Sequence, residues 1–355
     1  MTTWDLLIGG YTRDESDIAE PVGNVPETAR TAVLDDGGRL TDTGRLLSGV
    51  NPSWIAWHPG GTVAYACDED FTAGATGSVA AWELGATEPV RVVSSGGHAP
   101  CHVAVVPDGD GLALVLSHYV GGQVSVVPLD AAGRPDEAPS DVVVHSGAAF
   151  VHPEQEAPHP HQAMFDPASG LVWVSDLGQD RLVGYRLRGG VLMEVAELVT
   201  PPGFGPRHAA LHPGGNHLAL VGELANEVLL CRRGQQGGWQ EVSRRSTLPL
   251  GWSGRSDAAA LVWSPDGAHL YASNRGHDSV AVWAFDEGAL ALIGHSPAGA
   301  APRDFCLAPD GRWALSAAQG EHRVIAFPVR GDGLLGAEVG SIACRYPSRV
   351  AVRGR

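Results

Sequence analysis

The sequence has little of what membrane-spanning or disulfide-bonded proteins contain. No run of about 18 apolar residues occurs, so we expect no membrane-spanning helix. The opening stretch, MTTWDLLIGGYT, lacks a basic segment followed by an apolar one, and we expect no signal peptide. Only five cysteines occur in 355 residues, without a Cys-x-x-Cys pair. Because they are scattered and odd in number, they predict reduced, buried thiols and a cytoplasmic protein.

Basic residues are also scarce, since 24 of them stand against 40 acidic residues and the net charge is −16. A surface with this charge repels phosphate backbones, which argues against nucleic acid and anionic membranes as partners. The charge leaves room for a local basic pocket that binds a small anion. We therefore expect a small-molecule ligand and a monomer or weak homodimer.

What the sequence does have is glycine, proline and a recurring phrase. The 47 glycines and 25 prolines suit many short strands joined by tight turns. A short apolar strand, a proline, a glycine-containing turn and a second apolar strand recur six times. The prolines of this phrase are Pro59, Pro107, Pro167, Pro213, Pro265 and Pro309. Their period of roughly 50 residues is typical of four-stranded propeller blades. A polar insert at 68–77 and an irregular stretch at 148–160 lengthen two repeats.

The two ends of the chain supply a seventh repeat. YPSRVAV at 346–352 matches the first strand of the phrase, and WDLLIGGYT at 4–12 matches the second. Strands three and four of this blade are expected at 28–35 and 44–50. The sequence therefore predicts an all-β, seven-bladed propeller, a single domain covering the whole chain from residue 1 to residue 355. Its last blade is closed by pairing the N-terminal strand with the C-terminal one.

Aligning the repeats predicts where a site lies. The first two strands of a blade are antiparallel, so the start of one and the end of the other meet at one mouth of the channel. The first-strand column contains Trp54, His102, His161, His208, Ala260, Asp304 and Arg349, and Cys101, Pro160, Arg207 and Arg303 are among the residues before them. The second-strand column contains Tyr119, Leu177, Glu223, Arg275 and Gln319, preceded by His118, Asp176, Gly222, Asn274 and Ala318. Converging charges of both signs indicate a small-molecule site.

Several of these segments resemble those of a known family. They are EAPHPH (156–161), GPRH (205–208), VGELANEV (221–228), SNRGHDSVAV (273–282) and PRDF (302–305). In order and blade placement they are similar to the lactonase family of seven-bladed propellers, the 6-phosphogluconolactonase type that is related to carboxymuconate-cyclising enzymes. The resemblance covers essentially the whole chain.

The resemblance implies both an activity and a set of site residues. It implies a hydrolase that opens a sugar lactone, ideally 6-phosphogluconolactone, and it points to His159 or His161, Arg207, Glu223 and Arg275. This sequence departs from the family at three positions. Gly222 stands where Asn is usual, Ala260 where Glu is common, and His118 where an Asn precedes Tyr119. These changes leave the exact lactone open.

Lactone opening needs a base that activates water and a cation that stabilises the oxyanion. Glu223 with His161 is the candidate base. One of Arg207 and Arg275 would stabilise the oxyanion and the other would bind the phosphate, and the sequence leaves open which arginine has which role. Further substrate contacts are expected from His102, His159, His208, Tyr119, Asp176, Asn274 and Arg303. The sequence has no Gly-x-Ser-x-Gly elbow, which disfavours a covalent serine mechanism. We expect no metal and no cofactor, although His159 and His161 have a spacing that could bind a metal.

Two other functions are compatible with the same residues. A carboxymuconate-type cyclase would form a lactone and would use the arginines to hold carboxylates. A propeller that binds a small molecule or a protein without catalysis would tolerate Ala260 and Gly222. Arg207 and Arg275 could also be structural, paired with Glu223 and Asp176.

Overall fold

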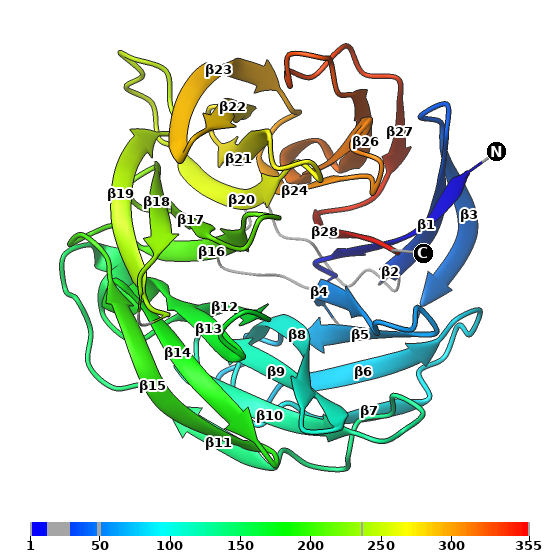
Figure 1. Ribbon diagram of the computed structural model, residues 1–355. Helices are drawn as coiled ribbons and strands as arrows, with labels where there is room; N and C mark the ends of the chain where they lie inside the picture. Colours follow the sequence, from blue (N-terminus) through cyan, green and yellow to red (C-terminus); the bar gives the residue numbers. More distant parts are fainter. Residues whose placement is uncertain (1, 13–28, 48–50, 236, 354–355) are drawn as a thin grey trace.

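A computed structural model of the chain describes residues 2–12, 29–47, 51–235 and 237–353. Within these ranges, seven four-stranded antiparallel sheets are arranged in a ring (Figure 1). This arrangement confirms the predicted seven-bladed propeller. The described residues include no helix that is long and apolar enough to cross a bilayer. All five cysteines are free, and four of them are buried as predicted.

Six blades follow the chain from the inside of the ring to the outside. The first three are β4 (Pro52–Trp57), β5 (Val63–Asp68), β6 (Ser78–Glu83) and β7 (Arg91–Ser94); β8 (Pro100–Asp108), β9 (Gly111–His118), β10 (Gln123–Leu129) and β11 (Asp141–Val144); and β12 (Pro160–Asp166), β13 (Leu171–Asp176), β14 (Arg181–Arg188) and β15 (Val191–Val199). The next three are β16 (Pro206–Leu211), β17 (His217–Gly222), β18 (Glu227–Arg233) and β19 (Trp239–Ser246); β20 (Asp257–Trp263), β21 (His269–Arg275), β22 (Ser279–Asp286) and β23 (Ala289–Pro297); and β24 (Pro302–Leu307), β25 (Trp313–Ala318), β26 (Arg323–Pro328) and β27 (Gly340–Ala343). Three short 3₁₀ helices lie in loops, namely η1 (Pro153–Gln155), η2 (Leu177–Gln179) and η3 (Gln319–Glu321).

The seventh blade contains both ends of the chain. Its strand order is β28 (Pro347–Val352), β1 (Thr3–Gly10), β2 (Ala29–Asp35) and β3 (Leu40–Leu47). Leu6 pairs with Val352 and Gly9 with Arg349, which confirms the predicted closure. Strand β3 begins at Leu40, earlier than the predicted 44, because the turn after β2 is short. Residues 28 and 48–50 of the predicted strands lie outside the described residues.

The blades are held together by apolar side chains that pack between neighbouring sheets. Trp173 and Trp283 are almost completely buried, each in a cluster that joins two successive blades. The inner strand β28 contacts both β24 and β4, so the ring of packed sheets is continuous through the closing blade. Gly9 is required at this junction, because a Cβ there would lie 2.1 Å from the carbonyl oxygen of Pro52.

Candidate functional site

A β-bulge at the start of the inner strand positions the site residues. In six blades the register shifts directly after a proline, so that one residue per blade has no partner on the second strand. These unpaired residues are Ser53, Cys101, His161, Arg207, Arg303 and Ser348. A bulge redirects the side chain that it carries. The repeat alignment placed His161 in the same column as His208. This placement was wrong by one residue, because the strand register makes His161 equivalent to Arg207 and Arg303.

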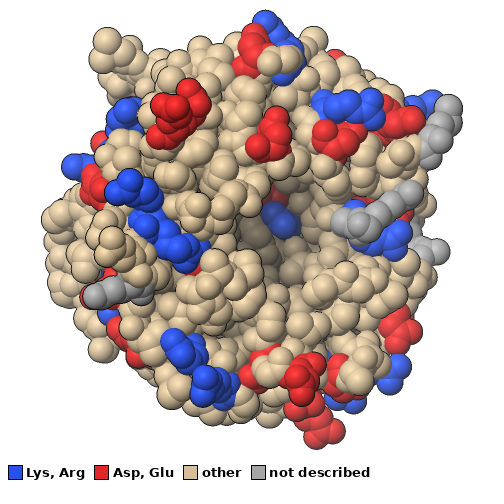
Figure 2. Space-filling view, viewed as in Figure 1, with Lys and Arg blue, Asp and Glu red and all other residues tan. Residues whose placement is uncertain are grey.

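Three of the bulge residues line a narrow cavity, which we call the throat. It has a volume of about 30 Å³. Its walls are Glu69, Phe71, Tyr119, His161, Arg207, Glu223, Arg275 and Arg303. The four predicted catalytic residues, which come from three different blades, thus meet in one cavity. One face of the propeller is hollowed at its centre, and charged atoms of both signs are visible inside the hollow (Figure 2).

Glu223 is held between two arginines. Its Oε1 accepts a hydrogen bond of 2.6 Å from Nη2 of Arg275, and its Oε2 lies 2.8 Å from Nε of Arg207. Burial alone would raise the pKa of Glu223, but Arg275 and Arg207 lower it below the usual value. The carboxylate is therefore ionised at neutral pH, with both oxygens engaged. The alternative pairing of one arginine with Asp176 is not found.

Arg207 is a fixed cation at the inner end of the throat. It is only 3% exposed, and Nη1 donates to the carbonyl of Ala259 at 2.9 Å. The carbonyl of Arg207 accepts a bond of 2.6 Å from Ser175. Its Nε–H is not aimed at any hydrogen-bond acceptor in the described part of the chain, although Glu223 is close. Burial lowers the pKa of Arg207 to about 10, so the guanidinium stays charged at neutral pH.

His161 is a neutral imidazole at the same depth. Burial, reinforced by Arg207 and Arg303, holds its pKa well below the ordinary value. Its Nδ1 is buried and has no hydrogen-bond partner among the described residues. The thiol of Cys101 donates to the carbonyl of His161 at 3.3 Å. Burial raises the pKa of this thiol well above its ordinary value, so Cys101 holds the bulge and is no thiolate nucleophile.

His102 and His208 lie beside His161 but do not line the throat. The rings of His161 and His208 are 5.3 Å apart, and Trp54 packs against both His102 and His208. Burial also keeps the pKa values of His102 and His208 well below their ordinary values. These two predicted substrate contacts therefore form an aromatic cluster that supports His161.

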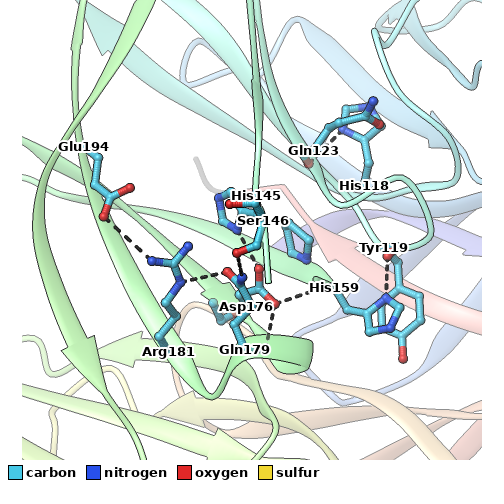
Figure 3. Close-up of polar contacts among 12 residues, drawn as sticks. His118, Tyr119, Gln123, His145, Ser146, His159, Asp176, Gln179, Arg181 and Glu194 are labelled. Carbon is cyan, nitrogen blue, oxygen red and sulfur yellow. Dashed lines mark hydrogen bonds and ion pairs between the residues drawn. The ribbon is translucent and has the colours of Figure 1, made fainter. Parts of the chain in front are cut away.

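Asp176 and His159 brace the wall of the throat rather than line it. The Asp176 carboxylate accepts hydrogen bonds from Nδ1 of His145 at 2.6 Å and from the backbone N–H of His159 at 2.9 Å (Figure 3). The ring of His159 stacks on Tyr119 at 4.5 Å, and its Nδ1–H donates to the Tyr119 carbonyl at 2.7 Å. Tyr119 in turn meets His161 edge-on at 5.8 Å. The network thus fixes Tyr119, which does line the throat.

Asn274 and Gly222 also have structural positions. Asn274 is fully buried and donates to the carbonyl of Thr247 at 2.8 Å, so the structure does not bring it into the throat. A Cβ at Gly222 would lie 2.5 Å from the carbonyl oxygen of Phe204 and 2.7 Å from its ring. The departure from the family's Asn is therefore matched by a phenylalanine that occupies the space.

The opposite wall joins residues from the two ends of the chain. Nη2 of Arg303 donates to the hydroxyl of Tyr11 at 2.6 Å, and that hydroxyl donates to Glu69 at 2.9 Å. Phe71, next to this group, was not predicted. Its only sequence signal is that it is the one aromatic residue of the polar insert at 68–77.

The throat opens into a larger cleft, which we call the vestibule. This cleft has a volume of about 820 Å³ and shares Tyr119, Glu223 and Arg275 with the throat. Its outer walls include His152 and Glu154 on one side and Leu248, Arg255, Ser256 and Asp257 on another. Except for Asp257, which begins β20, these residues were missed by the alignment of the repeats because they belong to loops without a counterpart in other blades. No described residues form a group of three or more His, Cys, Asp or Glu side chains that could hold a metal.

The chain is similar to known proteins along almost its whole length. The family described as "Lactonase, 7-bladed beta-propeller" matches residues 5–352. A 6-phosphogluconolactonase of Bacillus subtilis is 32% identical over 87% of this chain and 86% of its own. The structure of a periplasmic gluconolactonase of Pseudomonas aeruginosa is 25% identical, with a TM-score of 0.89 over 99% of both chains. A Lactobacillus plantarum protein is 26% identical, with a TM-score of 0.88 over 99% of this chain and 100% of its own.

Proposed function

Because the chain belongs to the lactonase family of seven-bladed β-propellers, we propose that it is a carboxylic-ester hydrolase that opens 6-phosphogluconolactone. The Bacillus subtilis relative is named a 6-phosphogluconolactonase, and the Pseudomonas aeruginosa structure is named a gluconolactonase. Both names describe enzymes that act on a gluconolactone. The proposal assigns the same class of substrate to this chain.

One observation carries the proposal. A neutral histidine and a fixed cation lie together in a cavity the size of a few water molecules, which opens into a much larger cleft. A cavity of about 10–15 Å³ is enough for one water, so the throat has room for the attacking water and the carbonyl oxygen. The lactone ring would lie in the vestibule, with its carbonyl pointing inward past Tyr119 and Arg275.

His161 is the better placed member of the Glu223/His161 pair to take the proton from water. Its Nδ1 has no hydrogen-bond partner among the described residues, whereas both oxygens of Glu223 are engaged by arginines. When His161 accepts the proton, the ionised Glu223 offsets part of the new positive charge. Later transfer of that proton to the ring oxygen opens the lactone and restores neutral His161. Positioned bases of this kind contribute on the order of 10²–10⁴-fold to the rate.

Arg207 is the group suited to stabilise the oxyanion. It is buried, and its backbone and its Nη1 are anchored, so it would not have to reorganise as charge develops on the carbonyl oxygen. Arg275 is more accessible, with 16% of its side chain exposed, and it lines both cavities. We assign Arg275 to substrate orientation at the constriction. Three arginines and two glutamates line the throat, so its formal charge favours an anionic transition state.

The test is a rate measurement on a panel of phosphorylated and plain aldonolactones. Proton release at constant pH reports ring opening, and the spontaneous rate of each lactone is subtracted. We expect turnover of 6-phosphogluconolactone well above the spontaneous rate, and none above it with the His161→Ala variant. If the wild-type protein accelerates no lactone in the panel, the hydrolase proposal is wrong.

A further inference from the structure

The two longest connections between blades both lie at the vestibule. Residues 145–159 join β11 to β12, and residues 247–256 join β19 to β20. The other five connections between blades contain three to six residues. His152 and Glu154 come from the first long connection, and Leu248 and Arg255 from the second. The two longest connections between successive blades thus meet at one cleft.

The vestibule is larger than a single hexonolactone requires. Its volume of about 820 Å³ lies near the upper end of the range of roughly 300–1,000 Å³ typical of small-molecule sites. Sites of that size enclose drug-sized ligands, whereas a hexonolactone has only about a dozen non-hydrogen atoms. Because the carbonyl end of the substrate is directed to the throat, the surplus space lies beyond the distal end of the sugar ring.

The charges of the outer vestibule are balanced. Nε of Arg255 lies 3.3 Å from Oδ2 of Asp257. Glu154 adds a carboxylate to the same lining, and Arg275 is paired with Glu223. A polar lining of this kind can take up a neutral group that is rich in hydroxyls.

The two long connections also expose apolar side chains. Phe150 is 75% exposed and Trp252 is 40% exposed. The Trp252 ring lies against Gly254, which lines the vestibule, because a Cβ at Gly254 would be 2.7 Å from that ring. A sugar ring has an apolar face and a polar rim, so it fits a polar cleft that has an aromatic ring such as Trp252 beside its lining.

We propose that the outer vestibule is a subsite for a second sugar, so that the protein also accepts aldonolactones carrying a glycosidically linked hexose. The lactone end lies at the constriction, and the second hexose lies between the connections at 145–159 and 247–256. This inference rests on the proposed lactone hydrolysis and adds a class of substrate to it.

The experiment compares kcat/KM for glucono-δ-lactone and for cellobionolactone, which differs by one added glucose. We expect cellobionolactone to be hydrolysed with at least an equal kcat/KM. Leu248→Trp, which narrows the vestibule from a half-buried position, should lower kcat/KM about tenfold more for cellobionolactone than for glucono-δ-lactone. Leu248→Ala keeps the space and should shift the ratio of the two kcat/KM values much less than Leu248→Trp. Leu292→Trp, on the exposed face of β23, is the matched control and should change neither.

The possible outcomes separate the two proposals. If glucono-δ-lactone is hydrolysed but cellobionolactone is more than tenfold worse in wild type, the subsite is wrong and the hydrolase stands. An equal loss on both substrates in Leu248→Trp also overturns the subsite, because the vestibule would then serve only the lactone end. If neither lactone nor 6-phosphogluconolactone is hydrolysed, the proposed function fails first.

Discussion

The throat and the vestibule share three residues but are built in different ways. Most of the throat is made from residues at the start of first strands and at the end of second strands, positions that the blade repeat fixes to one mouth of the channel, while Glu69 and Phe71 come from the insert at 68–77. The vestibule is made mostly from two loops that occur once each. The difference teaches that the ring of blades holds the reacting groups, while unrepeated loops shape the space around the substrate. Changes in the throat should therefore alter kcat, and changes toward the vestibule should alter KM.

The largest effect is expected from Arg207→Ala. Loss of an anchored donor to the oxyanion should lower kcat by about 10²–10³-fold with little change in KM, because the contact strengthens only as charge develops. Steady-state kinetics on the best lactone of the panel measures both constants. Arg233→Ala is the control, since Arg233 forms a comparable ion pair with Asp166 outside the throat, at 2.6 Å. A fall in kcat of the same size in the control would mean that Arg207 acts through stability alone.

A smaller effect is expected from Arg275→Ala, at the boundary of the two regions. If Arg275 orients the substrate as proposed, it contacts the substrate in the ground state as well as in the transition state, so its loss should raise KM about tenfold and change kcat less. Arg255→Ala, in the outer vestibule, should raise KM by less than Arg275→Ala. If Arg275→Ala instead lowers kcat as strongly as Arg207→Ala, the division of roles between throat and vestibule is wrong.

The smallest effect is a displaced pH limb. Burial and neighbouring arginines keep the pKa of His161 well below 6.5, so the neutral base persists as the pH falls. The pKa of Glu223 is also lowered, so its carboxylate stays ionised over the same range. The acid limb of kcat/KM should therefore have its midpoint below pH 6.5, as an apparent pKa of the coupled pair. Circular dichroism at each pH separates this limb from acid unfolding, and a midpoint at or above 6.5 would contradict a buried neutral base.

The propeller and its closure could be predicted because the repeat can be recognised directly from the amino-acid sequence. The turn prolines recur at blade spacing, and both ends of the chain match parts of the same phrase. Membership of the throat could also be predicted for Arg207, Glu223 and Arg275, because the repeat brings the ends of these strands to one channel mouth. His161 was indicated by the resemblance to the family, since the repeat alignment placed it one residue out of position.

The remaining features depend on interactions that a repeat alignment does not contain. The segment PHPH offers two prolines for alignment, and only the strand register shows that Pro160 is the equivalent one. Asp176 and Asn274 lie at the predicted ends of their strands, but they form hydrogen bonds with neighbouring backbone groups and do not line the throat. The vestibule depends on the conformation of two loops with no internal repeat. Phe71 could not be predicted for the same reason, because it belongs to the insert at 68–77, which has no counterpart in the other repeats.

The contact between Tyr11 and Arg303 has a consequence for biosynthesis. One wall of the throat joins a residue from the first strand made to a residue from the sixth blade, and β28 must arrive before β1 has an inner partner. Contacts of such large sequence separation form late, because the loop that they close is nearly the whole chain. A nascent chain can therefore complete several blades while the throat is still unformed. The proposed activity should therefore appear only after translation has finished and the ring is sealed.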